Sequence, residues 1–273
     1  MRTALAFSVI FSSSGAPVFA QNAQFDALYD ALGLPAVVEI MREEGVEYGG
    51  TLAESMLPGG GDARWPTVLD EIYDTQMMNA SLQSEMAGAL SGEDIDIILD
   101  FYTSDLGVKI IGLEVSARRA LLDPAIEEAS KEAATLQRLD DTPRSALATE
   151  FIVANNLIES NIAGSLNASY AFYMGLIDGG AVPAGVTPET AIEDVWAQEP
   201  LVREDTTDWV YSFVLMAYQP LTDDELQQLI AFSRTDAGEE LTQALFFAFD
   251  GLFNDISRGL GLGLARFMAT QEL

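Results

Sequence analysis

One pattern of residues occurs twice in this chain and constrains its fold more than any other feature. Residues 90–107 and 221–238 align without gaps. They share the identical pairs Leu90/Leu221, Phe101/Phe232, Asp105/Asp236 and Gly107/Gly238, with Ser104 replaced by Thr235. Each segment opens with a capping box and continues with apolar residues at helical spacing. We interpret the pattern as an internal duplication of a helix, a tight corner and a second helix; independent convergence on a common helix-turn-helix is the alternative.

The repeated residues suit a mechanical role. Phe101 and Phe232 close the apolar stripe of a short helix. The hydroxyl group at position 104 or 235 can cap the helix that follows, and the glycine at 107 or 238 allows another backbone to come close. We therefore predict that these residues shape the fold and perform no catalysis.

The first copy resembles a known family. The motif F-Y-x-S-x-x-G-x-K is present as Phe101, Tyr102, Ser104, Gly107 and Lys109. This motif, after a capped helix, is similar to the signature of the bacterial domain-of-unknown-function family 2059, over about 30 to 50 residues. The resemblance implies an exported, all-helical protein, and it implies no catalytic residue. The second copy lacks the tyrosine and the lysine, so it is at most a degenerate copy.

Helix signals dominate the rest of the chain. Thr142, Asp123 and Thr187 each precede a proline, which is typical of a helix start. The spacing of apolar residues predicts one long helix over 143–178 and further helices over 66–89 and 206–219, whereas strictly alternating β-branched runs are missing. We expect an all-α helical bundle without a substantial sheet, built from two related helical repeats over residues 21–140 and 141–273.

Two stretches near the C-terminus carry additional expectations. Residues 244–249 are apolar on every helical face, so they should lie at the centre of the fold or meet another apolar surface. The run Gly259-Leu-Gly-Leu-Gly263 follows a predicted helix and no βαβ unit encloses it. We therefore predict close helix packing at these glycines and no dinucleotide site.

The N-terminus has the pattern of a secretory signal peptide. A positive start at Arg2 precedes an apolar stretch, and Val18-Phe19-Ala20 matches the small-residue cleavage pattern. We predict that residues 1–20 are removed, that the mature chain begins at Gln21 and that the protein is periplasmic or secreted. No later stretch reaches the roughly 18 uninterrupted apolar residues of a membrane span.

Composition excludes several functions. The chain carries a formal net charge of −30, which repels phosphate backbones, so we expect no nucleic-acid partner. It contains no histidine and no cysteine, which removes the usual triads, thiol nucleophiles and the commonest ligands of transition metals. We predict no catalytic, metal-binding or cofactor-binding residue.

Two functional hypotheses remain. In the first, a non-catalytic binding or interaction protein takes up an apolar small molecule or a partner helix in a groove between the repeats. Its aromatic candidates are Tyr170, Phe172, Tyr173, Tyr211, Phe213 and residues 246–253. In the second, a hydrolase uses paired carboxylates. Its candidates are Glu43, Glu44 and Glu47, Asp94, Asp96 and Asp100, and the polar group Asn155, Asn156, Glu159 and Asn161. Simple core packing and a solvated face are the respective structural alternatives. The sequence leaves the oligomeric state open.

Overall fold

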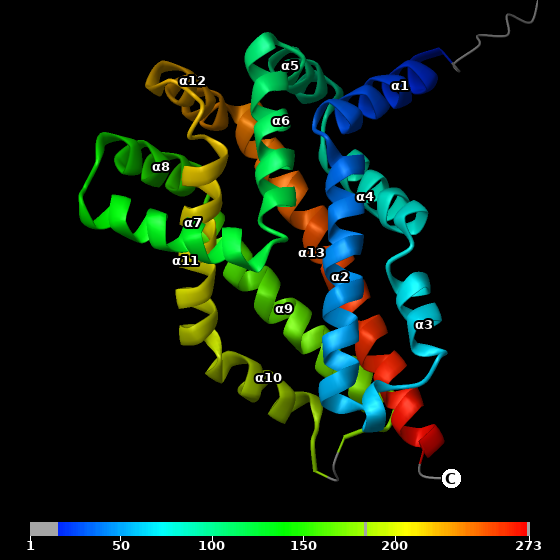
Figure 1. The fold of residues 1–273 in the computed structure, drawn as a ribbon. Helices are drawn as coiled ribbons and strands as arrows, with labels where there is room; N and C mark the ends of the chain where they lie inside the picture. Colours follow the sequence, from blue (N-terminus) through cyan, green and yellow to red (C-terminus); the bar gives the residue numbers. More distant parts are fainter. Residues whose placement is uncertain (1–15, 183–184, 272–273) are drawn as a thin grey trace, which may run out of the picture.

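The computed structural model describes residues 16–182 and 185–271, and these residues form helices and connecting turns with no β-strand, which confirms the all-α prediction (Figure 1). The helices are α1 (Ala16–Ala31), α2 (Leu34–Met56), η1 (Pro58–Gly60), α3 (Trp65–Ile72), α4 (Thr75–Ala89), α5 (Gly92–Tyr102), α6 (Asp105–Ala120), α7 (Pro124–Leu139), α8 (Pro143–Ala154), α9 (Leu157–Asp178), α10 (Pro188–Ala197), α11 (Glu199–Ala217), α12 (Asp223–Ser233) and α13 (Asp236–Gln271). No helix among the described residues has both the length and the apolar character that crossing a membrane requires.

The signal-peptide prediction falls mainly on residues 1–15, which lie outside the described residues. The backbone of residues 16–20 belongs to the start of α1. Removal of residues 1–20 therefore stays a prediction, as does the division of the mature chain at residue 140.

Helix α13 organises the molecule. It runs diagonally behind α2 and α6 and lies alongside α9 over much of its length (Figure 1). The largest core cluster combines residues from the first hundred positions, such as Leu28 and Ile98, with α13 residues such as Ala248 and Leu264. One face of the apolar stretch 244–249, which includes Ala244 and Ala248, is therefore buried in the core, whereas Phe247 on another face is 61% exposed.

The glycines of α13 permit a close helix crossing, as the sequence indicates. A Cβ atom at Gly261 would overlap the carbonyl oxygen of Phe172, and one at Gly175 would overlap the carbonyl oxygen of Arg258. Because Gly175 and Gly261 have no side chain, the backbones of α9 and α13 can meet directly at these two positions.

The expected helix over 143–178 is wrong, because the chain breaks at two asparagines between α8 and α9. The Asn155 side-chain amide donates a hydrogen bond to the Phe151 carbonyl at 2.9 Å, and its Oδ1 accepts one from the Thr242 hydroxyl at 3.0 Å. Asn156 adopts a left-handed conformation with φ 50°. Asparagine tolerates this region better than most residues, so it ends one helix and starts the next.

The expected helix over 66–89 is likewise two helices. Helix α3 ends at Ile72, and Asp74 caps α4 by accepting a hydrogen bond from the Met77 amide at 2.9 Å. The apolar periodicity runs through both helices and conceals this internal cap. The third expected helix, 206–219, corresponds to the longer α11.

The two repeated segments form corners with the same hydrogen bonds. The amide of Gly107 donates to the Ser104 hydroxyl at 3.1 Å, and the amide of Gly238 donates to the Thr235 hydroxyl at 3.1 Å. A Cβ atom at Gly107 would overlap the carbonyl oxygen of Phe101, and Gly238 has the equivalent relation to Phe232. Both positions therefore require glycine, because the backbone of the preceding helix lies where any other residue would place its Cβ atom.

The two corners also touch each other. The rings of Phe101 and Phe232 stack with centroids 3.9 Å apart, and Tyr102 meets Phe232 edge to face. Lys109 donates hydrogen bonds to both carboxylate oxygens of Glu225, at 2.7 and 2.8 Å. Glu225 also completes the capping box of α12 with Thr222. The signature residues thus join the α5–α6 corner to the α12–α13 corner; duplication as their origin stays a prediction.

Candidate functional site

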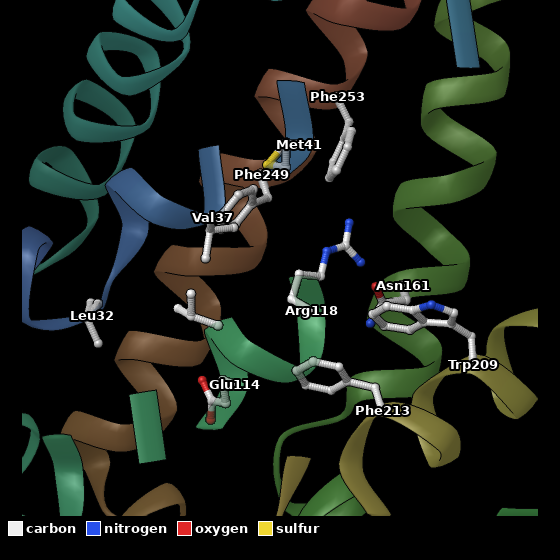
Figure 2. A pocket seen from close by; sticks show the side chains of 11 residues that line it. Leu32, Val37, Met41, Glu114, Arg118, Asn161, Trp209, Phe213, Phe249 and Phe253 are labelled. Carbon is white, nitrogen blue, oxygen red and sulfur yellow. The ribbon is translucent and has the colours of Figure 1, made fainter. Parts of the chain in front are cut away.

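A half-open cavity of about 250 Å³ lies where α2, α6, α9, α11 and α13 come together (Figure 2). Most of its lining is apolar, with one carboxylate, one guanidinium and one amide among the side chains. The lining residues are Leu32, Val37, Met41, Glu114, Val115, Arg118, Asn161, Trp209, Phe213, Phe249 and Phe253. They come from both sides of the seam expected at residue 140.

Aromatic side chains line much of the cavity. Trp209 and Phe213 are one turn apart on α11, and their rings stack with centroids 5.4 Å apart. Phe249 and Phe253 are one turn apart on α13, with centroids 6.3 Å apart. Phe253 is 41% exposed, so it marks the rim of the cavity. These four residues are called the aromatic wall below.

Arg118 extends into the space between Phe253 and Trp209 (Figure 2). Its guanidinium forms an ion pair with Glu44 of α2, and its central carbon lies 5.2 Å from the centroid of the Trp209 ring. Burial raises the pKa of Glu44, while Arg118 acts in the opposite direction. The positive charge of Arg118 is therefore matched by a carboxylate and rests on an aromatic face.

Glu114 lies one turn before Arg118 on α6. The hydroxyl group of Tyr218, the residue that directly follows α11, donates a hydrogen bond of 2.6 Å to Oε1 of Glu114. Burial raises the pKa of Glu114 to about 7, and the hydrogen bond from Tyr218 only partly offsets this. The pKa of Tyr218 is raised well above its ordinary value, mainly because the hydroxyl group is buried and secondly because the charge of Glu114 is close to it. The carboxyl group of this cavity-lining residue therefore changes its charge near neutral pH.

Three of the predicted aromatic residues line this cavity: Phe213, Phe249 and Phe253. The others lie elsewhere. Phe172 packs against the largest core cluster, and Tyr170 and Tyr173 pack against a smaller cluster around Leu166. Tyr211 contacts the guanidinium of Arg138, whose central carbon lies 4.2 Å from the ring centroid.

The predicted polar group does not form one site. Asn155 is buried and satisfied between α8 and α13, while Glu159 forms an ion pair with Arg203. Only Asn161 lines the cavity, and its amide donates to the Leu157 carbonyl at 2.7 Å. These residues therefore divide between a helix break, a surface ion pair and the cavity wall.

The predicted carboxylate pairs occupy other surroundings. Glu43 and Glu44 pair with Arg119 and Arg118, whereas Glu47 is exposed. Asp96 accepts a hydrogen bond of 2.7 Å from the Gln24 amide on α1, and Asp100 is exposed. Within residues 16–182 and 185–271, no three acidic side chains are grouped so that they could hold a metal ion.

The signature residues lie outside the cavity lining. The Ser104 hydroxyl donates to the Phe101 carbonyl at 2.6 Å, while Lys109 pairs with Glu225. The serine and the lysine therefore engage different partners.

Sequence reasoning missed Glu114, Arg118 and Trp209. A signal for Glu114 was present in the sequence, because the apolar residues Ile110 and Ala117 lie at helical spacing on the same face of α6, and Leu121 continues this spacing just after the helix. An acid inside an apolar stripe indicates a carboxyl group that faces the protein interior. With forty-three acidic residues in the chain, this one was hidden among many.

The comparisons with known proteins bear on the first half of the chain. No curated protein and no solved structure gives a match. A family model described as an uncharacterized protein conserved in bacteria (DUF2059) matches residues 76–135, which cover α4, α5, α6 and much of α7. Over residues 76–135, the chain therefore matches the DUF2059 family, as the motif from Phe101 to Lys109 indicates.

Proposed function

We propose that this chain is a non-catalytic binding protein that holds a small molecule with an apolar body in the cavity between α2, α6, α9, α11 and α13. The observation that carries the proposal is the aromatic wall around an open space of about 250 Å³, with few polar groups. Ligand pockets are typically lined by apolar and aromatic side chains with a small number of polar groups that fix orientation.

The position of the cavity supports this function. Its walls come from distant parts of the sequence, so the complete fold is needed to form it. A cavity of about 150 Å³ lined by apolar side chains binds benzene in another protein. The volume here of about 250 Å³ therefore suits an aromatic ring with a short substituent, or an aliphatic group of similar size.

The proposal includes an exported compartment, periplasmic or secreted. It is supported by the signal-peptide pattern of residues 1–20. A strongly acidic chain also remains soluble through charge repulsion.

The binding proposal is tested by calorimetric titration with 2-phenylethanol, a neutral probe with an aromatic body. Val115→Phe places a ring inside the cavity and should abolish saturable binding. Phe253→Ala removes part of the rim and should weaken binding several-fold, because buried aromatic contact area is lost. Val108→Phe is the matched control, because Val108 lies on the same helix and is 61% exposed.

The control should bind like the original protein. Unchanged binding by Val115→Phe, with circular dichroism showing an intact fold, would contradict this location for the ligand. If neither 2-phenylethanol nor its charged analogues bind the original protein saturably, the proposed function is refuted.

A further inference from the structure

We propose that the cavity selects a small organic cation, an amine or quaternary ammonium group on an aromatic or aliphatic body, with its charge at Glu114 and its body against the aromatic wall. This inference rests on the proposed function and adds the chemical class of the ligand. It is carried by the arrangement of charges in the cavity, by the aromatic faces and by the available volume.

Glu114 has the capacity to hold a cation. An ionised carboxylate offers about four lone-pair sites. The Tyr218 hydroxyl is the hydrogen-bond donor that reaches this side chain from the described part of the chain, at 2.6 Å from Oε1. Glu114 is one of the residues that line the cavity, so a ligand in the cavity that donates hydrogen bonds would use the remaining sites. A cationic donor would also neutralise the carboxylate, whose negative charge is unfavourable when it is buried without a countercharge.

The other charges of the cavity favour a cation over an anion. Arg118 is the cation among the lining residues, and Glu44 already pairs with it. Glu114 is thus a carboxylate without a cationic partner among the lining residues. The formal net charge of −30 adds a negative potential over the whole molecule, which attracts cations and repels anions.

The aromatic wall provides the second component of a cation site. The guanidinium carbon of Arg118 already lies 5.2 Å from the Trp209 ring centroid, so this ring holds one cation in the structure. Phe213, Phe249 and Phe253 add further rings around the same space. A ring face within about 6 Å of an organic cation stabilises it, and more strongly where water is excluded. An organic cation can therefore combine apolar contact with charge recognition.

The test compares three probes with similar phenyl-containing bodies and different charges: 2-phenylethylamine, 2-phenylethanol and 3-phenylpropionate. Titrations at about pH 8 keep Glu114 ionised, because its pKa is raised to about 7. Salt at about 0.3 M weakens attraction by distant surface charges. We expect the amine to bind at least about tenfold more tightly than the alcohol, and the propionate to bind most weakly.

Glu114→Gln should reduce the affinity for the amine to that for the alcohol and leave the alcohol unchanged, because it removes the charge and keeps the shape. Glu240→Gln is the matched control: it removes the same charge from an exposed position on α13 and should preserve the preference. Tyr218→Phe removes the donor to Glu114 and keeps the carboxylate, so it should retain the preference for the amine. Circular dichroism of each variant verifies the fold.

The possible results separate the two proposals. Binding of the alcohol as tightly as the amine, tightest binding of the propionate, or an unchanged preference in Glu114→Gln would each overturn the cation proposal while leaving the cavity as a binding site. If no probe shows saturable binding, the proposed function itself fails.

Discussion

Replacing Glu114 by glutamine should stabilise the protein at neutral and alkaline pH. The amide keeps the size of the side chain, and its carbonyl oxygen can accept the hydrogen bond from Tyr218. Burial raises the pKa of the carboxyl group from 4.5 to about 7 in the folded protein, so the folded state binds a proton more tightly than the unfolded state. The stability from that proton is complete below pH 4.5 and is lost as the pH rises toward 7.

The magnitude follows from the same shift. Each pH unit between the two pKa values corresponds to about 1.4 kcal/mol, so ionisation of Glu114 costs at most about 3 kcal/mol of the free energy of unfolding above pH 7. Water that enters the half-open cavity lowers this figure. The difference between Glu114→Gln and the original protein should therefore grow from near zero at about pH 4.5 to between about 1 and 3 kcal/mol at about pH 8.

The assay is urea unfolding followed by far-ultraviolet circular dichroism at several pH values and constant salt. Glu240→Gln, treated in the same way, reports the general effect of removing one negative charge from an acidic protein. The pH dependence should be weaker in Glu114→Gln than in this control. A stability difference that is constant with pH, or a loss of stability in Glu114→Gln at about pH 8, would refute the reasoning about burial.

Three further predictions concern the corners and the N-terminus. Gly107→Ala should destabilise the fold by about 1–3 kcal/mol in urea unfolding, because its methyl group overlaps the Phe101 carbonyl; Gly112→Ala, on the same helix with open space around it, should be neutral or stabilising by up to about 1 kcal/mol. A double-mutant cycle with Lys109→Met and Glu225→Gln should give a small favourable coupling that decreases with salt, because both side chains are partly exposed; a coupling unaffected by salt would contradict an ion pair. Sequencing of the protein exported by a bacterial host should start at Gln21, and an uncleaved product would refute the cleavage prediction.

Local signals predicted much of the helical fold because caps and apolar periodicity are short-range features. Thr142, Asp123 and Thr187 cap α8, α7 and α10 as their positions before proline indicate. The same approach failed where two helices share one apolar periodicity. The break at Asn155 depends on Thr242 of α13, and such a contact between distant residues is invisible in a local pattern.

The candidate site was predicted less well than the fold. Aromatic content indicated Phe213, Phe249 and Phe253, but aromatic side chains at helical spacing also fill cores, so their positions alone do not locate a pocket. Only the packing of α6 against α11 brings Tyr218 to Glu114, and only the approach of α2 to α6 brings Glu44 to Arg118. The arrangement of charges at the cavity therefore depends on tertiary structure.

The position of α13 has a consequence for the order in which the molecule can be assembled. Residues 25–98 share one core with residues 232–267, so the earlier segment has no complete apolar interior until the later segment has left the ribosome. Until then, side chains such as Leu28 and Ile98 lack their α13 neighbours and stay exposed to water. Deletion of residues 232–267 should therefore leave an N-terminal part that aggregates and is easily digested by proteases. In the intact chain, residues 25–98 and 232–267 should unfold together in one transition.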